Sequence, residues 1–122
     1  MKNKLTITRT GQENLVTLLL NGRIDAYWSS TLDDAVNTEI RSGNYHIFLD
    51  FGNVDFLSSA GIRILIKSYK ELIKINGELK VVNLNSDLRN ILEMVGLEML
   101  MGEPAVKKQE AKTPKKGRLS LG

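Results

Sequence analysis

Apolar residues form two kinds of pattern along the first hundred positions. Residues 4–9 alternate between apolar and threonine positions, which is typical of a half-buried edge strand. Residues 15–20 are almost continuously apolar, as in a strand that is buried on both faces. A short polar turn joins the two runs, so we predict an antiparallel hairpin.

Three later stretches place their apolar residues at helical spacing. They predict helices over residues 29–42, 58–75 and 85–95. The longest has the stripe Ile62, Leu65, Ile66, Tyr69, Leu72 and Ile73. Apolar runs at 45–51 and 79–84 predict two more strands, and residues 97–101 predict a short final one.

Polar residues mark the expected helix ends. Ser29 or Ser30 is expected to cap the first helix, with Ser30 and Asp33 approximating a capping box. Asn76 precedes Gly77 where the long helix should stop, because asparagine tolerates the left-handed conformation. Asn85 or Ser86 is the expected cap of the last helix.

The predicted order is β-β-α-β-α-β-α, with an optional last strand. Strands that alternate with helices form right-handed crossovers and parallel pairs, whereas the first hairpin is antiparallel. We therefore expect an α/β fold with a mixed sheet of four to five strands and three to four helices. Residues 1–102 form this domain. Residues 103–122 have no apolar period and are expected to be a disordered basic tail.

Composition narrows the function classes. The chain of 122 residues is 42% hydrophobic and has no cysteine, so disulfides and thiolate chemistry are excluded. Its net charge is +3, but residues 103–122 hold six cations against two carboxylates, which leaves about −1 for residues 1–102. The expected domain is therefore not a basic nucleic-acid surface. No signal peptide or apolar run of membrane-spanning length is recognised, so we expect a cytoplasmic protein.

Residues suited to catalysis are sparse. The single histidine, His46, lies inside a predicted strand, and no P-loop, Gly-x-Ser-x-Gly or zinc-ligand pattern occurs. Asp25, Asp50 and Asp55 can gather at one end of the sheet, either as a magnesium or acid–base cluster or as turn and cap residues. The second alternative is favoured because no nucleophile accompanies them. We predict neither an enzyme nor a bound metal or cofactor.

The most informative stretch is residues 55–63, Asp-Phe-Leu-Ser-Ser-Ala-Gly-Ile-Arg, where a strand leads into the long helix. Ser58 or Ser59 can accept a hydrogen bond from the first free N–H groups of that helix. The same helix end suits a phosphate, because its N–H groups and dipole favour negative charge. From the sequence alone, this turn can be a helix cap, a phosphate site, or both in alternation.

Asp50-Phe51 at the end of a strand, followed by Val54-Asp55-Phe56-Leu57-Ser58-Ser59-Ala60-Gly61-Ile62, resembles the signature of STAS domains. The resemblance spans roughly residues 4–101 and is with the small stand-alone bacterial members, the anti-sigma factor antagonists. It implies that Ser59 is the phosphoacceptor. Ser58 stands where many antagonists carry aspartate, and it is the alternative site.

The resemblance also implies a mechanism and partners. The unphosphorylated protein would bind an anti-sigma factor, which in this family is a serine kinase with an ATP-binding fold of the histidine-kinase type. Phosphorylation adds about −1.5 to −2 charges and would spoil the docked surface by repulsion and desolvation. A serine phosphatase would restore binding.

The implied partner-binding surface surrounds the serine turn. Its residues are Asp25, Tyr27, Trp28, Asp55, Leu57, Ser58, Ala60, Gly61, Arg63 and Ile64. Two of them have equal alternatives: Ile64 either contacts the partner or is covered by a neighbouring helix, and Trp28 either contacts the partner or packs over the sheet end.

Four other functions stay open at this point. A partner-switch or scaffold subunit with a non-sigma target, or a small ligand-binding module, can use the same fold. An enzyme is a third alternative, and a nucleic-acid binder acting through the lysine-rich tail is a fourth.

Overall fold

The computed structural model describes residues 4–12 and 14–102 of the chain. The strands are β1 (Leu5–Gln12), β2 (Leu15–Ile24), β3 (His46–Leu57) and β4 (Glu78–Val82), and the helices are α1 (Ser29–Arg41), α2 (Ser59–Lys74) and α3 (Ser86–Met94). A short 3-10 helix, η1 (Glu98–Leu100), follows α3. The predicted element order is confirmed.

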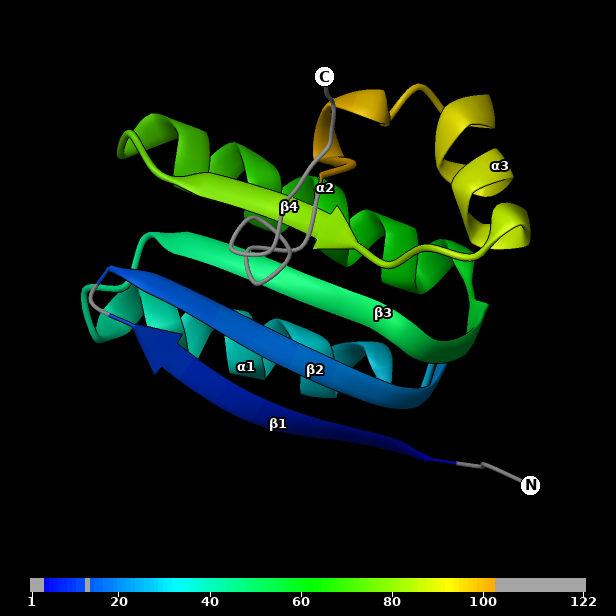
Figure 1. Cartoon of the computed structure of the whole chain (residues 1–122), viewed down its shortest axis with the longest axis horizontal. Coiled ribbons are helices and arrows are strands. Elements are labelled where there is room, and N and C mark those ends of the chain that lie inside the picture. The colour runs from blue at the N-terminus through cyan, green and yellow to red at the C-terminus, as the bar shows by residue number, and fades with distance from the viewer. Residues whose placement is uncertain (1–3, 13, 103–122) are drawn as a thin grey trace, which may run out of the picture.

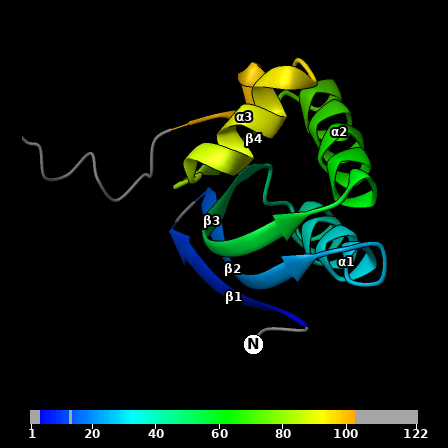
Figure 2. The same cartoon turned by 90° about the vertical axis from the view of Figure 1, so that its right-hand side faces the viewer.

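The four strands form one sheet in the order β1-β2-β3-β4 (Figure 1). β1 and β2 are antiparallel, whereas β2–β3 and β3–β4 are parallel, as expected for a hairpin followed by crossovers. Figure 2 shows α1 and α2 on one face of the sheet, and α3 and η1 beyond β4. The predicted mixed α/β fold is therefore confirmed, with four strands.

The core lies between the sheet and its two covering helices. Alternate residues of β2 and β3 point toward α1 and α2, because successive side chains of a strand point to opposite faces. The apolar stripes of the two helices pack against these strand residues. The fully buried residues include Leu18, Leu20, Ile24, Ile47, Leu49, Leu32, Val36, Leu65 and Leu72.

Both central strands are longer than predicted. The pattern placed their ends at residues 20 and 51, but β2 continues to Ile24 and β3 to Leu57. Their pairing shifts register between Leu19 and Asn21 and again between Gly22 and Arg23. In β3 the alternation of buried and exposed side chains breaks at these irregularities, so its pattern appeared to stop early. β2 alternates to its end, but most of its positions after Leu20 are polar or glycine, so its apolar run ends there. Gly22 has φ +126°, and a Cβ there would lie 1.9 Å from the Lys4 carbonyl oxygen.

The predicted final strand at residues 97–101 is largely wrong. Residues 98–100 form η1, and only Met101 makes a bridge, with Val81 of β4. Leu97 and Leu100 are both buried, and this spacing of three suits a 3-10 turn better than a strand.

The predicted cap of α1 is also wrong. Trp28 occupies the N-cap position without a side-chain cap. The Ser29 and Ser30 hydroxyls instead donate to the carbonyls of Ala26 and Tyr27, at 3.0 and 3.4 Å. The other helix ends follow the sequence: Asn76 has φ 63°, and the Asn85 side chain accepts from Leu88 N at 2.8 Å.

One buried carboxylate ties α1 to the edge strand. Glu39 accepts from Arg9 Nε of β1 at 2.6 Å and from Asn44 Nδ2 at 2.9 Å. Burial raises the pKa of Glu39, but the hydrogen bonds from Arg9 and Asn44 and the charge of Arg9 outweigh burial and lower its pKa overall.

No helix in residues 4–12 and 14–102 is long and apolar enough to cross a membrane. The expected tail, residues 103–122, lies outside the described residues.

Candidate functional site

The two serines of the turn have different positions in the structure. β3 ends at Leu57 and α2 begins at Ser59, so Ser58 is the N-cap residue. Its hydroxyl accepts a hydrogen bond from Gly61 N at 3.1 Å, and its own N–H donates to the Ile24 carbonyl at 2.9 Å. Ser58 therefore satisfies the helix end and joins it to β2.

Ser59 is exposed in the first turn of α2. Its hydroxyl makes no hydrogen bond within the described part of the chain. Since Ser58 already provides the cap, modification of Ser59 would break no capping contact. A phosphate there would lie at the positive end of the α2 dipole, in contact with solvent.

Gly61 brings α2 close to the ends of the central strands. It is buried, and a Cβ at this position would lie 2.7 Å from Ile24 Cγ2 and 2.7 Å from Leu57 Cδ1. A side chain at residue 61 would therefore push the first turn of α2 away from the sheet. Gly61 and the buried Leu57 support the site from beneath and offer no exposed contact.

The loop between β2 and α1 places an aromatic side chain at the surface. Asp25 Oδ1 accepts from Trp28 N at 2.9 Å and so closes the loop. Tyr27 is 75% exposed, with its ring 4.9 Å from that of Trp28 in an edge-to-face arrangement. Trp28 is half-buried and packs against the core. Trp28 therefore anchors the loop, and Tyr27 is the member of the pair that a partner can reach.

Two residues of this surface were absent from the predicted set. Arg23 and Phe56 are paired in the β2–β3 register, and the Arg23 guanidinium lies 4.2 Å from the centre of the half-exposed Phe56 ring. Arg23 Nε also lies 3.9 Å from Asp25 Oδ2. Because both predicted strands ended before these residues, their pairing could not be predicted from the hydrophobic pattern. Phe56, an aromatic residue next to the serine turn, was the sequence feature that could have indicated this part of the surface.

The remaining predicted residues divide between the surface and the interior. Asp55 and Arg63 are exposed, whereas Ala60 and Ile64 are half-buried. Ile64 packs against the core, which favours cover by neighbouring residues over a partner contact.

Of the candidate carboxylates, Asp50 accepts from Gly52 N at 2.9 Å and from Asn83 Nδ2 at 3.0 Å. It therefore lies at the irregular part of β3 and links this strand to the residue that follows β4. His46 lies away from this end of the sheet, with Nδ1 3.3 Å from Glu78 Oε1.

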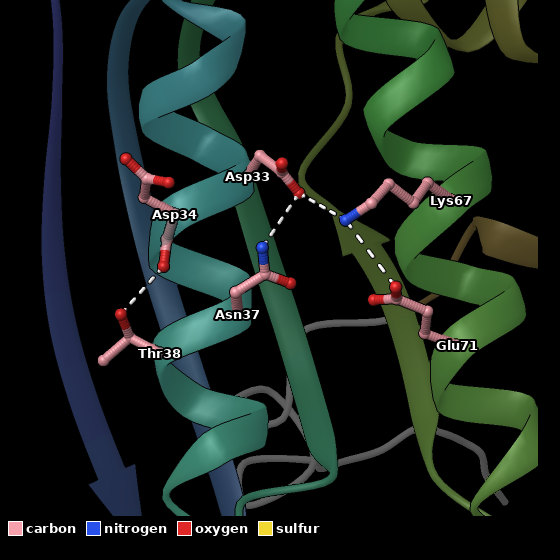
Figure 3. Close-up of polar contacts among 6 residues, drawn as sticks. All are labelled: Asp33, Asp34, Asn37, Thr38, Lys67 and Glu71. Carbon is pink, nitrogen blue, oxygen red and sulfur yellow. Dashed lines mark hydrogen bonds and ion pairs between the residues drawn. The ribbon is translucent and has the colours of Figure 1, made fainter.

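A polar bridge connects the two helices that border the site (Figure 3). Lys67 Nζ of α2 donates to Asp33 Oδ1 of α1 at 2.9 Å and lies 3.7 Å from Glu71 Oε2. Asn37 Nδ2 contacts the same Asp33 oxygen at 3.4 Å. The hydrogen bond from Lys67 to Asp33 raises the pKa of Lys67. The bridge helps to fix the start of α1, and so the Tyr27 loop, relative to α2.

Comparison with known proteins adds family information. Residues 6–112 match the family model of the STAS domain. BtrV of Bordetella bronchiseptica, which has the provisional name of anti-sigma factor antagonist, is 27% identical over 93 residues, 76% of this chain and 78% of the relative. The anti-sigma-B factor antagonist of Staphylococcus aureus is 24% identical over 97 residues, 80% of this chain and 90% of the relative.

Solved structures share the fold. SpoIIAA in its unphosphorylated form, an anti-sigma factor antagonist, aligns with a TM-score of 0.73 and 18% identity, covering 89% of this chain and all of that one. The phosphorylated form of the same Bacillus protein aligns with a TM-score of 0.67 and 20% identity, covering 82% and 92%. At these identities the structural likeness shows the fold alone.

Proposed function

Because this chain belongs to the STAS domain family, we propose that it is an anti-sigma factor antagonist switched off by phosphorylation of Ser59. The division of roles between the two serines carries this proposal. Ser58 caps α2 through Gly61 N, whereas the Ser59 hydroxyl is exposed and has no hydrogen bond within the described residues. A kinase can therefore modify Ser59 without removing a contact that holds the fold.

The proposed binding surface is the exposed part of the strand ends around Ser59. Tyr27 and Phe56 offer aromatic contact area, and Arg23, Asp55 and Arg63 add charges of both signs. Aromatic residues and arginine are common anchors of protein interfaces. Ser59 lies in the first turn of the helix that borders this surface.

Phosphorylation would act locally on this surface. The added charge of about −1.5 to −2 would be desolvated on docking and repelled by acidic groups of the partner. Because the Ser58 cap stays in place, the fold need not change. The expected result is loss of affinity without loss of stability.

The proposed partners follow from the names of the relatives and from the family resemblance. The binding partner would be an anti-sigma factor that is also a serine kinase, and a serine phosphatase would return Ser59 to its unmodified form. In this scheme the chain is a substrate and a binding switch, and it catalyses no reaction itself.

The test combines phosphopeptide mapping of the protein isolated from its own cells with pull-downs using wild type, Ser59→Ala, Ser59→Asp and Ser58→Ala. We expect phosphate on Ser59 and a kinase-like partner that Ser59→Ala and Ser58→Ala retain and Ser59→Asp loses. Phosphate on Ser58 alone would support a phosphorylation switch, but with Ser58 as the modified residue in place of Ser59. Equal capture by Ser59→Ala and Ser59→Asp, with no phosphate on either serine, would refute the proposal.

A further inference from the structure

A second surface with exposed apolar side chains lies far from Ser59, between the last turns of α2, the start of β4 and η1. Ile73 and Met99 are 48% and 44% exposed, and they line an open groove of about 430 Å³ together with Tyr69. Glu78 and Lys80 also line it, so the charges of the groove itself balance. Ile73 is 14 residues after Ser59 in the same helix, roughly 21 Å along its axis. A molecule seated in this groove would leave the serine turn free.

The outer side of α2 next to this groove is basic. Arg63, Lys67, Lys70 and Lys74 recur at spacings of four, three and four residues, so they follow one line along the helix. All four are exposed. Lys67 pairs with Asp33 and Glu71, whereas Lys70 and Lys74 have no ion pair within the described residues. α2 has three more cations than carboxylates, so its exposed side favours an acidic partner.

The chain itself carries a segment of the complementary kind. Residues 93–98, here called the corner, have the sequence Glu-Met-Val-Gly-Leu-Glu and run from the end of α3 to the start of η1. Gly96 turns the backbone with φ 77°, and the buried Leu97 anchors it. The turn leaves Met94 79% exposed.

Val95, beside Met94 in the corner, is also exposed, and the pair is bordered by the exposed carboxylates of Glu93 and Glu98. The corner therefore combines a protruding apolar pair with two negative charges. This combination complements an apolar groove that lies beside the basic side of α2. Methionine suits such a contact, because its flexible side chain adapts to irregular apolar cavities.

We propose that this edge of the molecule pairs two copies of the chain, with the corner of each copy seated in the α2–η1 groove of the other. The groove and the corner adjoin, since Met99 of the groove directly follows Glu98 of the corner. Figure 2 shows α2, α3 and η1 together at the edge opposite β1. Across a two-fold axis, the corner of each copy contacts the groove of the other. Both patches of both copies are then occupied, so the assembly stops at a dimer.

The charges define a sharp test. Lys70→Glu with Lys74→Glu makes the side of α2 beside the groove acidic, and Glu93→Lys with Glu98→Lys makes the corner basic. In a dimer of either variant alone, the corner and the side of α2 that it contacts carry charges of the same sign at both contacts. When the two variants are mixed, both contacts of the mixed dimer again join opposite charges.

Sedimentation equilibrium over a wide concentration series measures this association for the full chain. We expect wild type to dimerise reversibly and each charge variant to associate at least about tenfold more weakly. The mixture should recover dimer. Met94→Asp should also abolish association, and thermal melts should show folded protein because Met94 is exposed. Arg41→Glu, on the exposed side of α1, is the matched control and should change nothing.

A protein that stays monomeric at every concentration would overturn the proposal. So would a dimer that is unaffected by Met94→Asp and by both charge variants, because that dimer would use another surface. Ser59→Asp should leave self-association unchanged. Loss of the phosphorylation switch and loss of the dimer are therefore separate outcomes.

Discussion

Replacing Gly61 by alanine tests how closely α2 must approach the sheet for the serine turn to form. The new methyl carbon would lie 2.7 Å from Ile24 Cγ2, 2.7 Å from Leu57 Cδ1 and 3.3 Å from the Ile24 carbonyl oxygen. Favourable contacts between carbon atoms occur near 3.5–4.0 Å, so about 1 Å of movement is needed against each side chain. Ile24 and Leu57 are both buried and cannot move into solvent.

Two opposing terms set the size of this effect. Inserting a methylene-sized group into a packed core costs about 1–3 kcal/mol, and two simultaneous clashes place Gly61→Ala toward the upper end. Alanine recovers up to about 1 kcal/mol of helix propensity relative to glycine. We therefore expect a net loss of about 1–2 kcal/mol in the free energy of unfolding. For a domain of this size that lowers the Tm by roughly 4–16 °C.

Urea unfolding followed by circular dichroism, together with thermal melts, measures the change. Gly11→Ala is the matched control. Gly11 is exposed in β1, and its new methyl would lie 3.4 Å from the guanidinium of Arg9, the far end of a flexible side chain. The control should stay within about 0.5 kcal/mol of wild type. If Gly61→Ala is as stable as wild type, the close approach of α2 does not require glycine and the reasoning fails.

Other substitutions test the remaining contacts. Ser58→Ala should lower the free energy of unfolding by about 1 kcal/mol through loss of the cap, whereas Ser59→Ala should change it by at most a few tenths in the same urea titration. Ser68→Ala should raise it by about 1 kcal/mol, because the buried Ser68 hydroxyl has no hydrogen-bond partner in the described structure; an unchanged midpoint would show that the group is satisfied. The folded-state pKa of Glu39 lies below its unfolded value, so its stabilising effect is present above the unfolded pKa and is lost as pH falls through the folded pKa. Acid titration of stability should therefore be less steep in Glu39→Gln than in wild type, and identical profiles would contradict the assignment.

The sequence determined the elements and their order. Apolar stripes and runs predicted the three helices and four strands that form, because burial of one face imposes a period of 3.6 or 2 on the chain, and they also predicted a fifth strand at residues 97–101 that does not form. Short local signals also specified Asn76 and Asn85 at helix ends, since backbone conformation and capping there depend on neighbouring residues alone. The serine turn was located in the same way.

Tertiary contacts decided what local signals left open. The sequence allowed either serine to cap α2, and the position of Gly61 against Ile24 and Leu57 sets the register in which Ser58 is the cap. The full lengths of β2 and β3 depend on pairing through two register shifts, so the contact between Arg23 and Phe56 could not be read from either segment. The groove and the corner adjoin only because α2 and η1 pack beside the same edge of the sheet. A one-dimensional pattern reports which side of each element is buried, whereas the neighbours of an exposed side chain are set by how distant segments pack together.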